Sequence, residues 1–439
     1  MPGRQSVVMF ALLYQIEQAS RGTAEALEAA QFRQLAELLG HAAQNVPFLQ
    51  PRLKSAFSAF DAESIAANWH ALPPLTRQEL QEAAATLYAY RVPKTHGRLM
   101  DWSTSGSSGT PVLGRKTELS MSFWHAVDMR EVLWHNLDLS GRLVAIRRDR
   151  SPQSIDGVRH QPAWGPELGN AFNTGPCTQL DTRMSSERQL HLLGELEASC
   201  LATHPSVVEE LARICLAQNI RLPHLKSVRT FGEALPPDLH DLVSETWGAK
   251  LSDTYSSQEA GIIALQCPEH RHYHVQSATI KVEVLHPDNT QCQPGETGRI
   301  VVTPLHNFAM PLLRYEQGDM AEVGRTCSCG RAEMVLTRIF GRQRQMMRMA
   351  DGSRRHVAGG TKRFTGFPSI IRGQLAQVAF DTIELRLVVR APLTEAEEDE
   401  LHRRIEDDVG AELFLRVVYL DDLPRSEGGK FETFRCEVT

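Results

Sequence analysis

Apolar positions in the first part of the chain recur at helical spacing. From Ala24 to about Gln44, leucine, phenylalanine and alanine side chains return every three or four residues, which predicts a helix that lies on a hydrophobic core. Two prolines in the stretch LPPLTRQEL then interrupt the chain, and Thr76 is placed to cap a second helix. We therefore expect the amino-terminal segment to be helical.

The middle of the chain alternates short apolar runs with helical stretches. The runs RLVAIRR, SVRTFGEAL and AKLSDTYSS are separated by the stretches VVEELARICLAQN and DLHDLVSETWG. This alternation predicts strands joined by crossover helices, and hence an α/β sheet. From Ala278 the pattern becomes strand-like, with TIKVEVL and GRIVVTPL on either side of a turn-rich connection. A β-rich subdomain is therefore expected after the α/β part.

The pattern and the composition both change after Gly341. Between Arg338 and Arg363 the chain has seven arginines and one lysine against a single aspartate. A small α/β pattern follows, with the strand IELRLVVRA, the helix TEAEEDELHRRIEDDV and the strand LRVVYL. Thr394 and Glu397 have capping-box spacing at the start of that helix. We place a domain boundary near Gly341.

The composition is that of an ordinary globular protein. Of 439 residues, 42% are hydrophobic and 23% are charged, which argues against fibrous and disordered classes and allows two or three domains. The net charge of −6 gives no support for a nucleic-acid partner. No apolar run reaches the ~18 residues of a membrane-spanning helix, and no small-residue cleavage site follows MPGRQSVVMFALLYQIEQ. We expect a cytoplasmic protein without a membrane partner; the pattern leaves its oligomeric state open.

The stretch STSGSSGTPV, Ser103 to Val112, has the composition of a phosphate-binding loop. Glycines let backbone N–H groups approach a ligand closely, and serine and threonine hydroxyls donate hydrogen bonds to phosphate oxygens. The stretch has neither the Gly-Lys-Ser/Thr of a Walker loop nor the G-x-G-x-x-G of a dinucleotide site. A flexible Ser/Gly linker has the same composition, so this stretch alone does not decide between the two.

Four further motifs follow the Ser/Gly stretch in order: YSSQE, LRYEQGD, the pair Gly341-Arg342 and LPRSEGGKFE. In order and spacing, the five motifs resemble the adenylate-forming superfamily of acyl-CoA synthetases and nonribosomal adenylation domains. The stretches NVPFLQPRL, LPPLTRQEL and CSCGR are similar to its phenylacetate-CoA ligase branch. The resemblance implies a large amino-terminal domain over residues 1–340, with α/β sheets plus a β-rich subdomain, and a small mobile α+β lid over residues 341–439.

The resemblance assigns the Ser/Gly stretch to ATP. It implies that the β- and γ-phosphates are bound, while pyrophosphate leaves, by Thr104, Ser105, Gly106, Ser107, Ser108, Gly109 and Thr110. Thr110 stands where many relatives have lysine. Part of the phosphate charge must therefore be neutralised by magnesium or by another group.

The other motifs imply the remaining nucleotide contacts. Tyr255 would stack on adenine, and Glu259 would hold magnesium, because a hard dication favours carboxylate oxygen. Asp319 would accept hydrogen bonds from the ribose hydroxyls, and Arg342 would add a donor there. The nucleotide site would also include Gly232, Glu233 and Ser256.

Lys430, in LPRSEGGKFE, fits the carboxy-terminal lysine of the superfamily. By the resemblance it contacts the substrate carboxylate and the α-phosphate, where charge develops during transfer. Without the set of motifs, the structural interpretation would be simpler. Lys430 would be an exposed loop lysine, Glu259 a helix-start acid, Tyr255 a core tyrosine and Asp319 a turn residue.

Three cysteines and several histidines have the composition of a zinc site. Cys267, Cys327 and Cys329 supply three thiolates, and the stretch CPEHRHYH supplies candidate imidazoles. We favour His270 as the fourth ligand from its C-x-x-H spacing, with His272 and His274 as alternatives that would complete the site. Some relatives carry zinc at similar positions, and the role expected here is structural. The alternative is reduced thiols and solvated histidines.

The function expected from this resemblance is activation of a carboxylic acid by Mg-ATP to an acyl adenylate, with release of pyrophosphate. Transfer of the acyl group to a thiol would follow, on coenzyme A or on the phosphopantetheine arm of a carrier protein. An aryl acid is preferred because of the branch, and the acid pocket is expected around Trp124, His204 and Phe231. The basic run after Arg338 could bind the phosphorylated thiol.

Two departures from the ligase pattern keep other functions open. Arg344 stands where relatives commonly have an acid at the pivot between domains, and MADGSRRHVAGG replaces a compact loop of the thiol tunnel. These departures favour capture of the adenylate by an amine or another nitrogen nucleophile; activation of a non-carboxylate oxyanion is a further alternative. A catalytically silent nucleotide-binding scaffold is the alternative from another class, although Glu259 and Lys430 are both present.

Overall fold

The chain forms two compact units in the computed structural model, which describes residues 4–103, 112–149, 151, 153–342, 346–351, 354–355, 357, 361–364, 366–409, 414–423, 425–426 and 429–438. Unit 1 consists of Met1–Leu137, Pro166–Phe172 and Thr254–Ile339. Unit 2 consists of Asp138–Gly165, Asn173–Asp253 and Phe340–Thr439. The domain boundary expected near Gly341 stays a prediction.

Unit 1 begins with helices, as the sequence predicts. Its α-helices are α1 (Arg4–Ser20), α2 (Ala24–Asn45), α3 (Leu49–Ala56), α4 (Ala62–Asn68), α5 (Arg77–Ala83), α6 (Glu118–Trp134) and α7 (Pro166–Ala171), with 3-10 turns η1 (Trp69–Ala71), η2 (Ala84–Leu87) and η3 (Lys94–His96). The predicted cap at Thr76 is confirmed. The Glu79 amide donates to Thr76 Oγ1 at 3.2 Å, and the Thr76 amide donates to Glu79 Oε2 at 2.8 Å, which is a capping box.

A mostly antiparallel set of strands makes up the rest of unit 1. Its strands are β1 (Leu99–Ser103), β2 (Leu113–Thr117), β9 (Gly261–Gln266), β10 (Tyr273–Val275), β11 (Ile280–Leu285), β12 (Thr297–Pro304), β13 (Tyr315–Val323) and β14 (Val335–Arg342). Strand β8 (Lys250–Ser257) enters this unit at Thr254. The hydrogen-bonded order is β11-β12-β13-β14-β10-β9-β8, and β1 and β2 form a separate two-stranded sheet among the described residues. The β-rich subdomain expected after Ala278 is therefore present.

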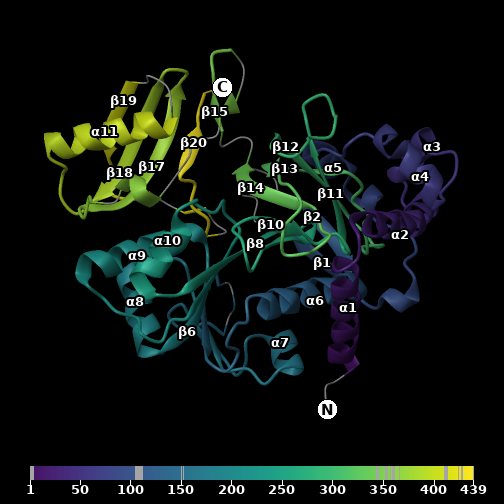
Figure 1. Ribbon diagram of the computed structural model, residues 1–439, viewed down its shortest axis with the longest axis horizontal. Helices are drawn as coiled ribbons and strands as arrows, with labels where there is room; N and C mark the ends of the chain where they lie inside the picture. The colour runs from purple at the N-terminus through teal and green to yellow at the C-terminus, as the bar shows by residue number, and fades with distance from the viewer. Residues whose placement is uncertain are drawn as a thin grey trace. The chain divides into compact units, whose positions relative to one another are not determined.

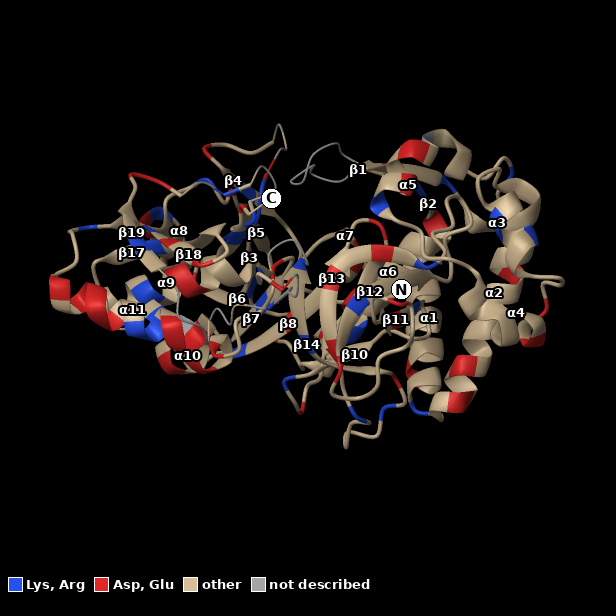
Figure 2. Cartoon of the chain, turned by 90° about the horizontal axis from the view of Figure 1, so that it is seen from above, with Lys and Arg blue, Asp and Glu red and all other residues tan. Residues whose placement is uncertain are grey.

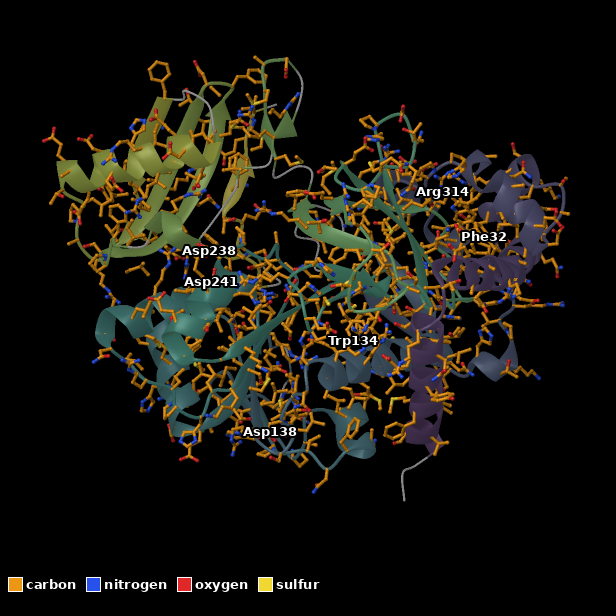
Figure 3. All side chains as sticks on the ribbon, in the orientation of Figure 1. Phe32, Trp134, Asp138, Asp238, Asp241 and Arg314 are labelled. Atoms are coloured by element: carbon orange, nitrogen blue, oxygen red, sulfur yellow. The ribbon has the colours of Figure 1, made fainter. Side chains whose placement is uncertain are left out.

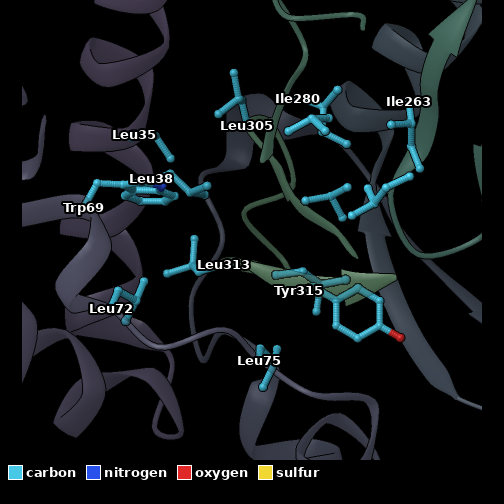
Figure 4. Packing of buried hydrophobic residues seen from close by; sticks show 14 of the residues in the cluster. Leu35, Leu38, Trp69, Leu72, Leu75, Ile263, Ile280, Leu305, Leu313 and Tyr315 are labelled. Atoms are coloured by element: carbon cyan, nitrogen blue, oxygen red, sulfur yellow. The ribbon is translucent and has the colours of Figure 1, made fainter. Parts of the chain in front are cut away.

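The core of unit 1 joins these helices to these strands. Leu35 and Leu38 of α2 pack with Trp69 in a cluster that also contains Leu313 and Tyr315 (Figure 4). All five side chains are at most 2% exposed, so they remove large apolar areas from water. The helical face predicted from the spacing in α2 is the face that contacts the strands.

Unit 2 contains the predicted α/β sheet. Its strands are β3 (Arg142–Ile146), β4 (Val158–Gln161), β5 (Cys177–Leu180), β6 (Ala198–Thr203) and β7 (Ser227–Phe231), and its helices are α8 (Ser186–Glu195), α9 (Pro205–Gln218) and α10 (Leu239–Trp247). The strand order is β7-β6-β3-β5-β4; β7, β6, β3 and β5 are parallel, and β4 is antiparallel at the edge. Helices α8 and α10 both pack against α9 (Figure 1). The expected α/β class is confirmed.

The carboxy-terminal part of unit 2 is a small α+β sheet. Its elements are β15 (Met347–Arg348), β16 (Arg354–Arg355), η5 (Thr361–Phe364), β17 (Ile370–Ala379), β18 (Thr382–Val389), α11 (Glu395–Val409), β19 (Phe414–Tyr419) and β20 (Phe434–Cys436), with order β19-β18-β17-β20. Leu401 and Ile405 of α11 are buried in its core. Most of the other positions of α11 are acidic or basic residues (Figure 2). Among the described residues, no helix combines the length and apolarity that a bilayer span needs.

Candidate nucleotide and acid site

The predicted phosphate loop, Thr104 to Thr110, lies outside the described residues. The strands on either side of it form an antiparallel hairpin in which Ser103 pairs with Leu113. Both ends of the Ser/Gly stretch are therefore attached to one end of a hairpin in unit 1. Arg342 is the last residue of β14. Arg344, like the predicted phosphate loop, lies outside the described residues.

The structure brings together the residues predicted to bind adenine and ribose. Tyr255 lies on β8 and Asp319 on β13, and the Tyr255 hydroxyl donates to Asp319 Oδ2 at 2.6 Å. Asp319 is only 8% exposed, so this hydrogen bond satisfies part of a carboxylate that has little contact with water. Ser256 follows Tyr255 on β8. The pair presents an aromatic ring and a carboxylate side by side, as the resemblance implies.

Glu259, the predicted magnesium ligand, is in the turn between β8 and β9. It is 7% exposed, and Arg77 Nη1 lies 3.5 Å from Glu259 Oε1. The turn is held by a hydrogen bond of 3.0 Å from the Ala260 amide to Ser257 Oγ. The sequence analysis did not identify Arg77, although it comes directly after the predicted cap Thr76. Glu259 offers carboxylate oxygens, the ligand type that magnesium prefers, and Arg77 supplies positive charge to the same nearly buried carboxylate.

Trp124, one of the residues expected at the acid pocket, borders a cavity within unit 1. This Trp124 cavity is lined by α6 and by the turn before β9, among other segments, and Glu259 also lines it. The Phe123 ring stacks on the His306 ring with centroids 3.7 Å apart and an interplanar angle of 5°. Burial lowers the pKa of His306 to about 4, so at neutral pH the stack is formed by an uncharged imidazole. Lys116, which also lines the cavity, was not identified from the sequence.

Lys430 lies next to two other predicted site residues in unit 2. Gly232 has φ of +81°, and a Cβ atom there would be 3.3 Å from Lys430 Cε and 3.3 Å from the His204 ring. Glu233 accepts a hydrogen bond from the Phe431 amide at 2.7 Å and another from the Ser206 amide at 3.0 Å. The glycine therefore allows the lysine stem to approach, and Glu233 holds the chain directly after it.

His204 and Phe231, the other residues expected at the acid pocket, do not line the Trp124 cavity; His204 lies beside Gly232, which the Lys430 stem also approaches. The His204 Nδ1 atom lies 2.9 Å from the Phe231 carbonyl oxygen. Burial lowers the pKa of His204, and the nearby Glu233 carboxylate opposes that shift. An uncharged imidazole is thus packed between the end of β7 and the lysine stem.

Two arginines that the sequence analysis did not identify fasten the segment around Lys430. Arg425 Nη1 donates to Ser206 Oγ at 2.6 Å, and Arg425 Nη2 lies 3.1 Å from Glu210 Oε2. Arg372 Nη2 lies 3.2 Å from the same carboxylate oxygen. Glu210 is 9% exposed, so α9 presents one nearly buried acid to two guanidinium groups. Arg425 belongs to the LPRSEGGK motif, which was the available sequence signal.

The predicted zinc ligands lie together in unit 1. Cys267 Sγ is 4.0 Å from Cys327 Sγ, and His270 Nδ1 is 3.6 Å and 3.5 Å from these two sulfur atoms. Zn–S and Zn–N bonds of about 2.3 and 2.0 Å put tetrahedral ligand atoms about 3.3–3.8 Å apart, so these spacings fit zinc. Cys329 Sγ lies 3.3 Å from His274 Nε2.

Two overlapping groups of four could hold the ion. One group contains Cys267, His270, His272 and Cys327, and the other contains the three cysteines with His274. Burial lowers the pKa of His274 to about 3, which keeps its imidazole neutral. Its ring also contacts Trp134, at the end of α6, edge to face with centroids 5.9 Å apart (Figure 3). The C-x-x-H spacing points to His270, whereas the grouping of all three thiols points to His274.

Comparison with known proteins gives one curated sequence relative. No protein family model matches the chain. Over 275 residues the chain is 26% identical to a phenylacetate-coenzyme A ligase of Thermus thermophilus. This alignment covers 56% of the chain and 62% of that enzyme, so the chain spans less than two thirds of the length of the relative it matches.

Solved structures cover more of the chain. A 2-hydroxyisobutyryl-CoA ligase in the postadenylation state, in complex with R3-HIB-AMP, superposes with a TM-score of 0.75 at 18% identity, covering 96% of this chain and 91% of the other. The anthranilate CoA ligase AuaEII, in complex with anthranoyl-AMP, gives a TM-score of 0.55 at 14% identity and covers 75% and 65%. At these identities the structures speak for the fold. The resemblance seen in the motifs is thus confirmed: the chain has the fold of the adenylate-forming ligases and is similar in sequence to their phenylacetate-CoA ligase branch.

Proposed function

We propose that the protein activates a carboxylic acid with ATP to an acyl adenylate and then transfers the acyl group to the thiol of coenzyme A. The observation that carries the proposal is the position of Lys430. A lysine in a Gly-rich segment is usually solvated, yet this one packs against Gly232, about two hundred residues away in the sequence, and Glu233 binds the next backbone amide. An aryl acid is the proposed substrate class.

In the first step, a carboxylate oxygen of the acid attacks the α-phosphorus of ATP. The bond from that phosphorus to the bridging oxygen breaks, and pyrophosphate leaves. The Lys430 ammonium would stabilise the negative charge that develops on the α-phosphate. Tyr255 and Asp319 would hold the adenosine, which fixes the reacting atoms relative to one another. Magnesium held by Glu259 would neutralise phosphate charge.

In the second step, the coenzyme A thiol attacks the carbonyl carbon of the adenylate. The acyl C–O bond to AMP breaks, the thiol proton passes to solvent, and a thioester forms. Coenzyme A is the proposed thiol because relatives described as CoA ligases share both the fold and part of the sequence. A carrier-protein arm presents the same thiol chemistry on a tethered partner.

The test of the first step is acid-dependent exchange of labelled pyrophosphate into ATP over a panel of aryl, fatty and amino acids. We expect exchange with one class of acid, and a loss of about 10²–10³-fold in Lys430→Ala, as for removal of one charge-stabilising donor. Lys226→Ala is the matched control, because its side chain is exposed and, among the described residues, its ammonium donates to the Pro223 carbonyl oxygen. If Lys430→Ala exchanges pyrophosphate into ATP as fast as wild type does, the role assigned to Lys430 is wrong.

Adding coenzyme A to the same reaction tests the second step. Mass spectrometry should detect an acyl-CoA and stoichiometric AMP. Acyl adenylate that accumulates with coenzyme A, but that the enzyme consumes faster than the uncatalysed rate when an amine is added, would instead indicate an amine as the acceptor.

We also propose that the Cys/His cluster binds a structural zinc ion. The support is the spacing of its sulfur and nitrogen atoms and the neutral His274 imidazole. Elemental analysis should find about one zinc per chain, and Cys329→Ser and His274→Ala should each lower the zinc content and the thermal midpoint. Cys436→Ser is the control, because that thiol donates to Gln377 instead. If His274→Ala keeps its zinc and His270→Ala loses it, the ligands are instead the group that contains His270 and His272.

A further inference from the structure

The Trp124 cavity contains a charged side chain that no step of the proposed mechanism uses. Lys116 is the penultimate residue of β2, and only 7% of its surface is exposed to solvent. Its Nζ atom lies 4.3 Å from the centroid of the Trp124 ring and 5.8 Å from that of Trp102. Both distances are within the range of cation–π attraction. A lysine this deeply buried is rare unless it is paired.

Hydrogen-bond partners of this ammonium are missing among the residues that the structure describes. An ammonium has three donors, and no hydrogen bond or ion pair within this part of the chain uses those of Lys116. The Glu259 carboxylate is close enough to raise the pKa of Lys116, but Arg77 already pairs with that carboxylate at 3.5 Å. If Glu259 also holds magnesium, as proposed, still less of its negative charge is left to pair with Lys116. The cavity is then the direction from which an acceptor can reach Lys116.

Aromatic side chains form part of the cavity wall. Phe123 and Trp124 come from neighbouring positions on α6, and His306 continues the aromatic surface by stacking on Phe123. Gly261 has φ of +91°, a conformation that favours glycine, and a Cβ atom there would be in van der Waals contact with the Trp124 ring at 3.4 Å. A planar acyl group in this cavity would lie near the Lys116 ammonium.

Burial lowers the pKa of Lys116 to about 8, with Glu259 opposing the shift. At pH 7 the side chain is therefore still mostly protonated. An acceptor oxygen in the cavity would supply the hydrogen bonds that desolvation has removed, and such a site rejects a ligand that lacks the oxygen.

We infer that Lys116 determines specificity by hydrogen-bonding a second oxygen, a hydroxyl or a carboxylate, on an aromatic acid seated in the Trp124 cavity. This inference rests on the proposed function, and it narrows the aryl acids to those with an oxygen substituent besides the reacting carboxylate. A purely structural lysine held between two indole rings would show no such preference.

The experiment compares benzoate with its 2-, 3- and 4-hydroxy and carboxy derivatives, and phenylacetate with its hydroxy derivatives, by pyrophosphate exchange. In wild type, at least one oxygen-substituted acid should exceed its parent at least tenfold in kcat/KM. In Lys116→Met that ratio should fall to within threefold of one, and Lys116→Arg should retain part of the preference. An equal ratio in wild type and Lys116→Met overturns the inference; the hydroxy and carboxy arms distinguish the two kinds of oxygen.

Direct binding separates failure of this inference from failure of the proposed function. Isothermal titration calorimetry with the same acids, without ATP, measures their affinities for wild type and for Lys116→Met. One outcome would contradict the activation step and support the role of Lys116. In that case no acid supports exchange, wild type binds an oxygen-substituted acid at least tenfold more tightly than its parent, and Lys116→Met shows no such difference. If wild type binds parent and substituted acids with equal affinity, the inference about Lys116 is wrong. Thermal melts of each variant check that it is folded.

Discussion

Two of the buried cations in unit 1, Arg314 and Lys116, have different surroundings. Arg314, in the core next to β13 (Figure 3), is 1% exposed, and its Nη2 atom lies 2.8 Å from Glu283 Oε1. Its Nη1 atom also donates to the carbonyl oxygens of His70 and Leu72. Lys116 is nearly as buried, yet rings and one shared carboxylate are its only neighbours of note within the described residues.

The difference separates a structural cation from one available to a ligand. Arg314 connects the segment after α4 to β11 through Glu283, which also accepts a hydrogen bond from Trp69 Nε1 at 3.0 Å. All three groups are satisfied within the protein. Lys116 has donors left over and faces a cavity. Burial alone therefore does not identify a functional charge; burial with unused hydrogen-bonding capacity does.

The largest effect expected from this comparison is loss of stability in Arg314→Met. Removing one partner of a buried pair leaves Glu283 as an uncompensated charge, which costs about 3–5 kcal/mol. Urea unfolding should show this loss as a lower midpoint. Arg98→Met is the matched control, because its side chain is 86% exposed and its ion pair with Glu118 is solvated. Equal urea midpoints for Arg314→Met and Arg98→Met would show that the buried pair of Arg314 matters no more for stability than an exposed ion pair.

Lys116 should behave in the opposite way, and its effect depends on pH. Burial lowers the pKa of Lys116 from 10.5 to about 8, so protonated lysine disfavours the folded state most below pH 8. That penalty disappears as the pH rises towards 10.5, where the unfolded chain also loses its proton. The stability of wild type relative to Lys116→Met should thus rise between pH 8 and 10.5, by at most about 3 kcal/mol. Paired urea titrations across this interval measure it, and a fall instead of a rise would show that Lys116 is satisfied like Arg314.

The smallest expected effect is the coupling between Lys116 and Trp124. Cation–π attraction at a desolvated site is worth about 1–2 kcal/mol. A double-mutant cycle of Lys116→Met and Trp124→Leu should return a coupling free energy of this size. A coupling near zero would mean that the ring is only a wall of the cavity.

The sequence predicted much of the fold because the relevant signals are local. The apolar spacing of α2, the capping boxes at Thr76 and Thr394 and the alternation of strands and helices in unit 2 all depend on near neighbours in the chain. The Thr394 box is present, with the Thr394 amide donating to Glu397 Oε2 at 2.8 Å. Such patterns are readable without knowing what packs against them.

The site was predicted less completely because its environments are assembled from distant segments. Lys116 and Arg77 are ordinary cations in the sequence, and only the turn containing Glu259 gives them a shared carboxylate. The ambiguity between His270 and His274 has a similar origin. The C-x-x-H spacing measures distance along the chain, whereas His274 is directed towards Cys329 by the pairing of β10 with β9 and β14.

The double hydrogen bond at Glu233 has a kinetic consequence. This carboxylate accepts from the amide of Ser206, at the start of α9, and from the amide of Phe431, directly after Lys430. Withdrawal of the backbone segment that carries Lys430 has to break the second of these bonds and also the contacts of Arg425 with Ser206 and Glu210. These groups would have to be rehydrated together, so departure of the lysine is a cooperative event with a barrier of its own. The dwell time of Lys430 at Gly232 therefore depends on Glu233, Arg425 and Glu210 as well as on the lysine itself.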